Sequence, residues 1–315
     1  MQSRPLGRTG LSIMPLVFGG NVFGWTADEA TSFRLLDAFV DHGFNAIDTA
    51  DVYSAWAPGN KGGESETIIG RWLKRDPAKR DRVVVITKVG SDVGEGKTLK
   101  EEYIPRAAER SLARLGIDRI DLYLSHWPDD TTPHEETLAA FARLKDAGKI
   151  AAIGCSNFSA EQLKASLDAA RANGLPRYDV LQPEYNLVAR SSLEGPLLDL
   201  CRAEEIGVIT YFSLASGFLS GKYRSQADLS KSQRGGGLSK YLDARGLRVL
   251  DALDEVAGRH GAKPAEVALA WIMHKPGVTA PIASATSVEQ LESLARAAAL
   301  ALSGDDMRRL DEASA

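Results

Sequence analysis

The sequence predicts an α/β protein of the (β/α)8 class, a TIM barrel, in which residues 1–315 form one domain. Short apolar runs recur along the chain without the alternating pattern of strands that expose one face, so we expect strands buried on both faces. An amphipathic stretch follows each run, which is typical of βα units and a parallel sheet. The chain contains eight such units, and this number favours a closed barrel over an open sheet.

The predicted strands are the eight apolar runs themselves. In chain order they cover residues 15–18, 44–47, 83–86, 120–124, 150–153, 179–181, 207–210 and 278–282. From the second run to the seventh, the run ends are separated by 39, 38, 29, 28 and 29 residues, which is the spacing of βα units. The sequences of these units do not repeat, so the regularity lies in their length.

The predicted helices begin where this alternation requires them. Five capping-box patterns, each a Ser or Thr followed three residues later by Glu or Gln, start at Thr26, Thr98, Thr132, Ser159 and Ser287. Such pairs satisfy backbone donors at a helix N-terminus, and we expect a helix to begin at each.

Two segments depart from the regular pattern. Residues 4–11 have the turn chemistry of a small β-hairpin, which we expect at the bottom of the barrel. Residues 213–240 are rich in Gly, Ser, Lys and Arg, and a helical pattern resumes only at about Asp243. This long loop after the seventh strand is either a flexible surface insertion or a segment that closes over a ligand.

Composition excludes several classes of protein. The 38 basic and 42 acidic residues give a net charge of -4 without long runs of either sign, so we expect no nucleic-acid partner and no polybasic membrane anchor. No window approaches ~18 uninterrupted apolar residues, and the first residues lack the apolar region of a signal peptide. Two cysteines, Cys155 and Cys201, are too few for a disulfide framework. We therefore expect a cytoplasmic protein without a membrane span.

Polar side chains follow six successive predicted strands, at the barrel end where (β/α)8 proteins carry their reactive groups. They are Asp48, Lys88, His126, the pair Ser156 and Asn157, Gln182, and Tyr211, with Tyr53 five residues beyond Asp48. Each could be ordinary: a solvated lysine, a turn-forming aspartate, or a packing histidine or tyrosine. Together they suggest chemistry, because an ion pair of Lys88 with Asp48 would lower the pKa of Tyr53 toward neutrality and make it a general acid.

Five segments in this order closely resemble the aldo-keto reductases. They are GFNAIDTADVY at 43–53, GESE at 63–66, ITK at 86–88, DLYLSHW at 121–127 and GCSNF at 154–158. The resemblance extends from Leu6 to about Ala297. It implies a catalytic tetrad of Asp48, Tyr53, Lys88 and His126, a nicotinamide cofactor and no metal.

The same resemblance implies which residues hold the cofactor. Ser156, Asn157 and Gln182 would hold the carboxamide, and Tyr211 would stack on the nicotinamide ring. The pyrophosphate-binding loop would contain Leu214, Gly217 and Leu219, where small neighbours let backbone amides approach a phosphate. Further positions of the site are Gly20, Asn21, Val22, Ser213, Ala283 and Ala285.

The adenosine end departs from the family pattern. Thr286 and Gln290 match the usual contacts, although Gln290 could instead be the capping partner of Ser287, and Ser284 replaces a usual glycine. No Arg or Lys lies between residues 280 and 296 to hold a 2′-phosphate. By resemblance to the potassium-channel β-subunit branch, Lys222 and Arg234 would supply that charge. We therefore expect NADPH, with NADH as the alternative.

These residues predict reversible reduction of a small aldehyde or ketone by direct hydride transfer. Tyr53 would donate the proton and His126 would orient the carbonyl group. Two other functions remain open: a Schiff-base aldolase with Lys88 as nucleophile, and a non-catalytic, NADPH-binding regulatory subunit. An enzyme of the predicted kind would be a monomer or a small homo-oligomer.

Two further groups of residues allow more than one interpretation. The aromatic side chains near the strand ends either line a substrate pocket or pack in the core; they are Trp25, Trp56, Trp127, Phe23 and Phe218. Cys155 precedes Ser156 and is either a redox-sensitive thiol or, as we favour, a small buried residue.

Overall fold

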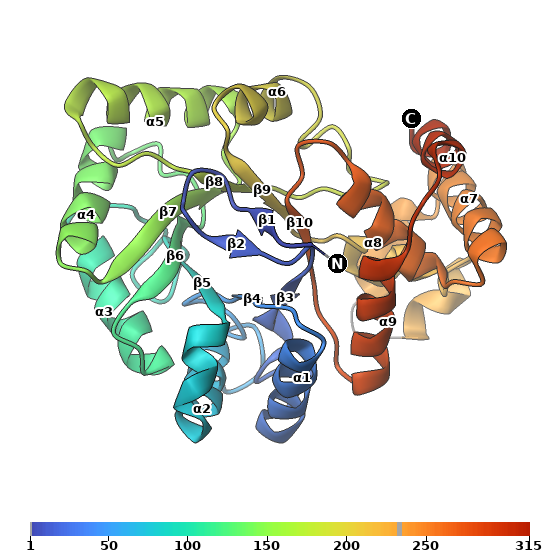
Figure 1. The fold of residues 1–315 in the computed structure, drawn as a ribbon, viewed down its shortest axis with the longest axis horizontal. Coiled ribbons are helices and arrows are strands. Elements are labelled where there is room, and N and C mark those ends of the chain that lie inside the picture. Colours follow the sequence, from blue (N-terminus) through green and yellow to red (C-terminus); the bar gives the residue numbers. More distant parts are fainter. Residues whose placement is uncertain (1, 232–234) are drawn as a thin grey trace.

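A computed structural model describes residues 2–231 and 235–315. Its eight parallel strands close into a barrel in the order β10-β3-β4-β5-β6-β7-β8-β9 (Figure 1). The strands are β3 (Val17–Gly19), β4 (Ala46–Asp48), β5 (Val84–Val89), β6 (Ile120–Ser125), β7 (Ile150–Ser156), β8 (Val180–Gln182), β9 (Gly207–Thr210) and β10 (Ala280–Ala283). Each overlaps one predicted apolar run, so the predicted fold class is confirmed.

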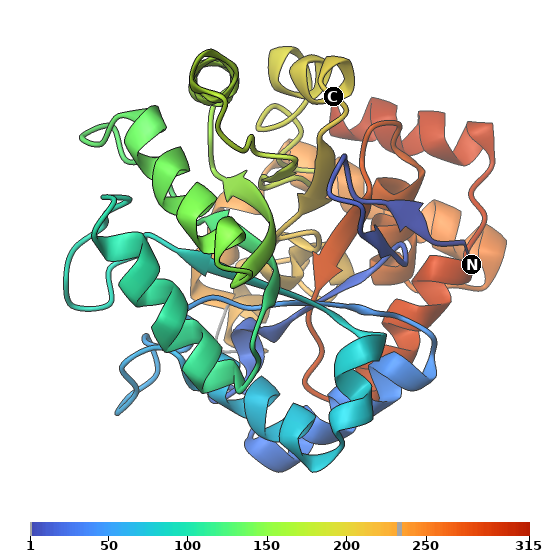
Figure 2. The same ribbon diagram turned by 60° about the vertical axis from the view of Figure 1, so that its left-hand side comes forward.

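Helices surround the barrel, as Figures 1 and 2 show. They are α1 (Glu29–Asp41), α2 (Glu64–Arg75), α3 (Tyr103–Leu115), α4 (His134–Asp146), α5 (Ala160–Asn173), α6 (Pro196–Ala203), α8 (Pro264–His274) and α9 (Val288–Ala299). Two more helices, α7 (Ala244–His260) and α10 (Gly304–Ser314), pack together outside this ring. Short 3-10 turns are η1 (Gly20–Val22), η2 (Pro77–Arg82), η3 (Ala215–Ser220), η4 (Gln226–Lys231) and η5 (Gly235–Tyr241).

Two of the five predicted helix starts are confirmed. Ser159 forms a complete capping box with Gln162 at α5, and the Ser287 hydroxyl accepts the first-turn amide of α9.

The predicted caps Thr26, Thr98 and Thr132 are wrong. Asp28 caps α1, and its carboxylate accepts the Thr31 amide at 2.8 Å. The Thr132 hydroxyl instead donates to Asp129 at 2.8 Å. At α3 and α4 the N-cap positions are occupied by Glu102 and Pro133, and neither makes a side-chain cap bond. The exact start of these helices therefore depends on loop geometry.

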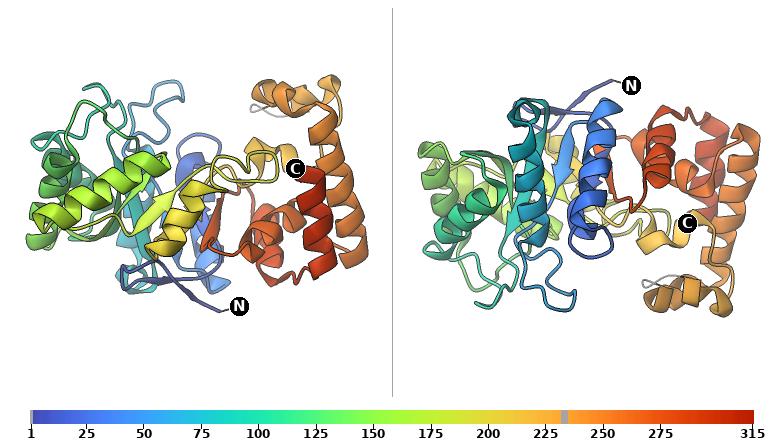
Figure 3. Two further views of the ribbon diagram at one scale, coloured as in Figure 1. Left: turned by 90° about the horizontal axis from the view of Figure 1, so that it is seen from above. Right: turned by 90° about the horizontal axis from the view of Figure 1, so that it is seen from below.

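The predicted N-terminal hairpin is present: β1 (Arg4–Pro5) pairs with β2 (Ser12–Ile13) in antiparallel fashion. The Leu6 and Ile13 side chains are fully buried in the cluster that fills the barrel interior. The Arg4 guanidinium donates to the Thr279 carbonyl oxygen at 2.9 Å, just before β10. Both panels of Figure 3 show the hairpin and the η4–η5 segment on opposite sides of the molecule, so the hairpin closes the barrel end away from the insertion.

Two glycines of this hairpin differ in their surroundings, which allows a matched test. Gly7 has a φ of 59°, and a Cβ there would lie 2.2 Å from the Asp179 carbonyl oxygen and 2.7 Å from the Gly207 nitrogen. Gly10 has a φ of 77° and open space around it. We expect Gly10→Ala to cost about 1 kcal/mol of backbone strain and Gly7→Ala about 2–4 kcal/mol, since overpacking adds to that strain. Urea denaturation measures both, and equal losses would contradict the tight seating of the hairpin.

The segment after β9 contains the three short turns η3, η4 and η5 and is not an irregular loop. Tyr223 and Leu238 are buried, and the Arg224 guanidinium pairs with Asp254 of α7 at 2.6 Å. The insertion is therefore attached to the outer helices by packing and by charge.

Candidate active site

The strand-end side chains predicted from the sequence meet at the carboxyl end of the barrel. Asp48 ends β4, Lys88 lies near the end of β5, and Gln182 ends β8. All three residues are at most 1% exposed. Burial of a lysine and an aspartate at this depth requires that they be paired.

Lys88 is the centre of this group. Its ammonium donates to Asp48 Oδ2 at 2.8 Å, to the Thr49 carbonyl oxygen at 2.8 Å and to Tyr53 Oη at 2.9 Å. The Tyr53 hydroxyl in turn lies 3.1 Å from Asp48 Oδ2, to which it can donate. Three acceptors thus take the three N–H groups of the lysine, which fixes its position beside the phenol.

Gln182 completes the group in a way that the sequence analysis missed. Its Nε2 donates to Asp48 Oδ1 at 2.8 Å, so both oxygens of the carboxylate are held. The contact joins β4 to β8 across the barrel interior. The sequence placed Asp48 in the tetrad and Gln182 at the carboxamide, but it did not predict their contact, which requires the closed barrel.

The expected lowering of the Tyr53 pKa is not found in this structure. Burial raises the pKa of Tyr53 well above its usual value, and the Asp48 carboxylate raises it further. Burial also lowers the pKa of Lys88, against the opposing effect of Asp48. Lys88 and Asp48 form a pair without net charge, so the lysine alone does not set the acidity of the phenol. Tyr53 is therefore protonated at neutral pH.

The loop after β4 holds Tyr53 in place. The Ser54 hydroxyl donates to the Phe23 carbonyl oxygen at 2.6 Å, and Ser54 adopts a left-handed backbone with a φ of 72°. The Asn60 side-chain amide donates to the Ser54 carbonyl oxygen at 3.0 Å. This bonding fixes a tight turn that directs the phenol toward Lys88.

His126 lies beside Tyr53, with 6.1 Å between the two ring centroids. Its Nδ1 is hydrogen-bonded to the Ser91 hydroxyl at 2.9 Å, so Nε2 is the ring nitrogen that remains to contact a ligand. Burial, with the nearby Lys88 and Lys97, lowers the pKa of His126 well below its usual value, so the ring is neutral. The sequence analysis missed Ser91, although a hydroxyl three residues past Lys88 could have been noted as another strand-end group.

The residues assigned to the carboxamide are joined in one network. The Asn157 side-chain amide donates to the His126 carbonyl oxygen at 2.9 Å, and the Tyr211 hydroxyl donates to Asn157 Oδ1 at 2.6 Å. The Ser156 hydroxyl donates to the Gln182 carbonyl oxygen at 2.7 Å. Asn157 has a φ of 65°, a strained backbone that such bonding can maintain. Amide and hydroxyl groups gathered beside a partly exposed tyrosine ring fit a planar ligand that carries a carboxamide.

The η3 turn presents backbone where the sequence predicted the pyrophosphate loop. Ala215, Ser216 and Gly217 all have positive φ, of 47°, 56° and 100°. The Leu214 carbonyl oxygen accepts the amides of Gly217 at 2.8 Å and Leu219 at 3.2 Å. A left-handed backbone is costly at Ala215 and Ser216, though not at Gly217, and such strain is often found in ligand-binding turns. The nearby Ser213 and Leu219 side chains are buried and pack inward.

The remaining cofactor positions fall into two classes. Ser284 Oγ lies 2.7 Å from the Gly19 carbonyl oxygen and 2.6 Å from Asn21 Oδ1, so the serine that replaces a usual glycine joins β10 to η1. The others are buried and contribute shape rather than polar side chains; they are Gly20, Val22, Ala283 and Ala285. A Cβ on Gly20 would lie 2.8 Å from Ser65 Oγ, so close packing already explains this glycine.

The predicted adenosine end is an open surface. Gln290 Oε1 accepts from the Thr286 backbone amide at 2.9 Å and lies 3.2 Å from the Thr286 hydroxyl. Gln290 therefore bonds with Thr286 and does not close a capping box on Ser287. Lys222 is exposed, with its ammonium 5.0 Å from the centre of the Tyr223 ring. Arg234 lies outside the described residues.

Aromatic side chains flank Tyr53 and His126, and we call this side of the group the mouth. Trp56 lies edge-on to both Trp25 and Tyr53, at centroid distances of 5.7 and 6.0 Å, and is 49% exposed. Trp127 stacks on His126 at 5.9 Å. The tryptophans therefore lie beside Tyr53 and His126. Phe23 and Phe218 are fully buried, which supports the packing interpretation for these two residues.

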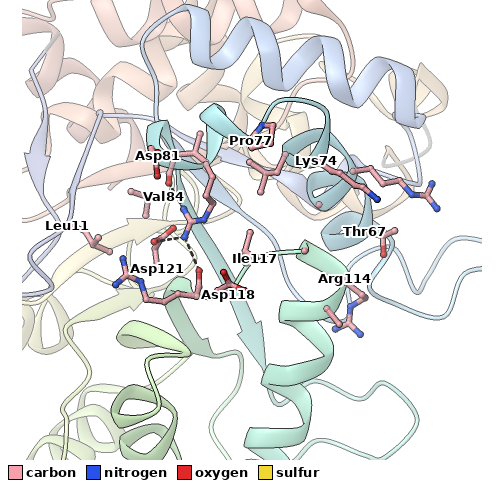
Figure 4. A pocket seen from close by; sticks show the side chains of 18 residues that line it. Leu11, Thr67, Lys74, Pro77, Asp81, Val84, Arg114, Ile117, Asp118 and Asp121 are labelled. Atoms are coloured by element: carbon pink, nitrogen blue, oxygen red, sulfur yellow. Dashed lines mark hydrogen bonds and ion pairs between the residues drawn. The ribbon is translucent and has the colours of Figure 1, made fainter.

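A groove lies away from this group (Figure 4). This groove of about 1360 Å³ is lined by residues of α2, η2 and α3 and by the amino-terminal side of β5. Within it the Arg80 guanidinium binds Asp121 at 2.8 Å and the Arg119 carbonyl oxygen at 2.9 Å. None of the strand-end polar residues lines the groove, so its size does not make it the active site.

Three other features of the described chain bear on the site. Within residues 2–231 and 235–315, no three His, Cys, Asp or Glu side chains are grouped so that they could hold a metal ion. No helix in these ranges is long and apolar enough to cross a membrane. Cys155 is fully buried, and this burial raises the pKa of its thiol. Both observations support the interpretation of Cys155 as a packing residue.

Comparison with known proteins relates the chain to the aldo/keto reductases. A sequence model described as "Aldo/keto reductase family" matches residues 15–315. The chain is 34% identical to the uncharacterized oxidoreductase YrpG of Bacillus subtilis, over 99% of this chain and 95% of that protein. It is also 34% identical to the aldo-keto reductase YhdN of the same organism, over 93% and 86% of the two chains. A probable voltage-gated potassium channel subunit beta of Arabidopsis thaliana is 34% identical, over 93% and 89%.

Proposed function

The chain belongs to the aldo/keto reductase family, and from this premise we propose that it reduces a small aldehyde or ketone with NADPH. The observation that carries the proposal is the contact of Tyr53 Oη with the buried Lys88 ammonium at 2.9 Å, below an aromatic mouth. A protonated phenol beside a fixed cation is suited to give a proton to a developing alkoxide. The bound cofactor supplies the hydride.

In this proposal the residues of the buried group have separate roles in proton transfer. Tyr53 gives its proton to the carbonyl oxygen as that oxygen gains charge. The Lys88 N–H that already points at Tyr53 Oη stabilises the phenolate left behind, and Asp48 keeps the lysine charged. Gln182 holds the second oxygen of Asp48, so the carboxylate does not turn away from the lysine.

His126 orients the substrate in this proposal. A neutral ring bonded to Ser91 through Nδ1 presents Nε2 to the carbonyl oxygen. A preorganised donor at such a position is worth about 3 kcal/mol in transition-state stabilisation. Trp56 and Trp127 shield the reacting atoms from water on the open side of the mouth.

An absorbance assay of NADPH consumption with a panel of aldehydes and ketones tests the proposal. We expect oxidation of NADPH only when a carbonyl compound is present. Binding of NADPH without turnover on any substrate would favour a regulatory subunit. Borohydride trapping of a substrate adduct on Lys88 would favour an aldolase, and either result would overturn the proposed reduction.

Cofactor choice rests on Lys222 and Arg234 in the proposal. We expect Lys222→Ala to weaken NADPH binding by about tenfold and to leave NADH binding within about twofold, because only NADPH carries the 2′-phosphate. Fluorescence titration measures both dissociation constants. Lys240→Ala, which removes another exposed lysine of the insertion, is the matched control. Equal loss of affinity for both cofactors in Lys222→Ala would contradict the assignment.

A further inference from the structure

A second buried polar group lies behind the proposed proton donor. Asp51 follows β4 by three residues and is 4% exposed. Neither of its carboxylate oxygens makes a hydrogen bond of good geometry with a described residue, and the nearby Val52 backbone amide only partly opposes the effect of burial on its pKa. The hydroxyls of Tyr103 on α3 and Tyr123 on β6 are also buried without a partner there. Buried polar atoms nearly always have a partner, so three such groups require an explanation.

Asp51 and Tyr103 line a cavity of about 130 Å³. At ~30 Å³ for each water molecule, a polar cavity of this size has room for about four. Lys61 and Arg110 line its outer side and are exposed, so the cavity communicates with solvent. It therefore fits a small cluster of water that bonds the otherwise unsatisfied oxygens of Asp51 and Tyr103.

Charged and titratable groups face Asp51 from every neighbouring element. They are Lys61 in the loop before α2, Glu66 on α2, Lys88 on β5, Tyr103, Arg110 and Arg114 on α3, and Tyr123 on β6. Glu66 is itself ion-paired, since it accepts from Arg114 Nε at 2.6 Å and from the Thr87 hydroxyl at 2.5 Å, but its charge still acts on Asp51. Arg114 is thus bound to Glu66 and only partly balances a charge on Asp51. Burial, with repulsion from Glu66, raises the pKa of Asp51 to about 8.

Asp51 is also connected to the proton-donating group. Its backbone amide donates to the Lys88 carbonyl oxygen at 3.4 Å, and the charges of the two side chains influence each other. We propose that Asp51 is a positioning residue: it holds a proton in a hydrated pocket behind Lys88, and loss of that proton weakens Tyr53 as an acid through Lys88. This inference rests on the proposed function of the Tyr53 group.

The direction of the effect follows from the charges. With Asp51 neutral, the Lys88 cation is balanced by Asp48 alone. When Asp51 ionises, a second negative charge acts on Lys88, and the phenolate formed at Tyr53 is less stabilised. The rate of carbonyl reduction should therefore fall as the pH rises through about 8.

The pH profile of reduction provides the first test. We expect kcat of the wild type to fall between pH 7 and pH 9, and the Asp51→Asn variant to lack this fall, so that the ratio of variant to wild-type kcat rises roughly threefold or more. Tyr103→Phe, which removes an uncharged group from the same pocket, should keep the wild-type profile. Persistence of the same inflection in Asp51→Asn would overturn the proposal.

Unfolding measurements provide a second test that needs no activity. In the unfolded chain Asp51 ionises at a pKa of about 3.9, whereas in the folded protein it holds its proton to about 8. Between these values the folded state binds the extra proton, so the wild type should lose stability relative to Asp51→Asn as the pH rises. A constant difference between the two urea midpoints from pH 4 to pH 8 would overturn the buried proton.

A double-mutant cycle with Lys88→Met separates this inference from the proposed function. If Asp51 acts on Lys88, the effect of Asp51→Asn on the pH dependence of stability must change when the lysine is absent. An unchanged effect would overturn the coupling even if the protein reduces aldehydes. A changed effect in a protein without reductase activity would retain the coupling and reject the proposed function alone.

Discussion

Tyr53→Phe is expected to lower the kcat for carbonyl reduction by about a thousandfold or more, because among the described residues no other hydroxyl is bonded to the Lys88 ammonium. The variant loses only a hydroxyl group, and Lys88 keeps its bonds to Asp48 and Thr49. We therefore expect a folded protein that binds NADPH within about twofold of the wild type. Single-turnover kinetics with 4-nitrobenzaldehyde measure the chemical step directly.

A matched control for this variant is Tyr178→Phe. The Tyr178 hydroxyl is buried and bonded to Ser125 at 2.7 Å, in the packing between β6 and the surrounding helices. Its loss removes the same atom from a site without proposed chemistry, so kcat should stay within about twofold. Reduction by Tyr53→Phe at a rate near that of this control would show that Tyr53 is not the acid.

Lys88→Met is expected to abolish reduction and to lower the free energy of unfolding by about 3–5 kcal/mol, because it leaves Asp48 buried without its cation. Asp48 would keep only its bond from Gln182 and the Tyr53 hydroxyl. Adding Asp48→Asn removes the buried charge, so the double variant should regain most of the lost stability. It should remain inactive, since the phenolate at Tyr53 is still unsupported.

Urea denaturation and the aldehyde assay together measure both effects. Restored stability without restored activity separates the structural from the chemical role of the ion pair. A double variant as unstable as Lys88→Met would mean that Asp48 is not the group left uncompensated. Normal stability of the Lys88→Met variant would contradict the ion pair between Lys88 and Asp48.

The strands, and the meeting of the polar residues at one end of the barrel, were predictable from the sequence. Both follow from the order of apolar runs and polar residues along the chain. Continuous apolar runs mark strands buried on two faces, and parallel strands of one barrel bring their carboxyl ends together. Asp48 and Lys88 therefore had to lie near each other once the eight units were recognised. The resemblance to a family added residue roles that spacing alone does not provide.

Features that depend on side-chain contacts were not predictable in the same way. The bond between Gln182 and Asp48 joins residues 134 positions apart, and the support of His126 by Ser91 depends on the course of two loops. The pKa of Tyr53 was expected to fall because the Lys88–Asp48 ion pair was taken to act on the phenol as a cation. Burial of the hydroxyl and the Asp48 carboxylate at 3.1 Å instead raise this pKa.

The most direct test of the proposed carbonyl reduction is whether a deuterium label moves from the cofactor to the product. The wild-type protein is incubated with 4-nitrobenzaldehyde and NADPH that carries deuterium at C4 of the nicotinamide ring, and the alcohol is analysed by NMR and mass spectrometry. We predict that the alcohol carries deuterium on its benzylic carbon and that Tyr53→Phe does not form this product. An alcohol without deuterium for either C4 epimer of the labelled cofactor, or label transfer that does not depend on Tyr53, would contradict it.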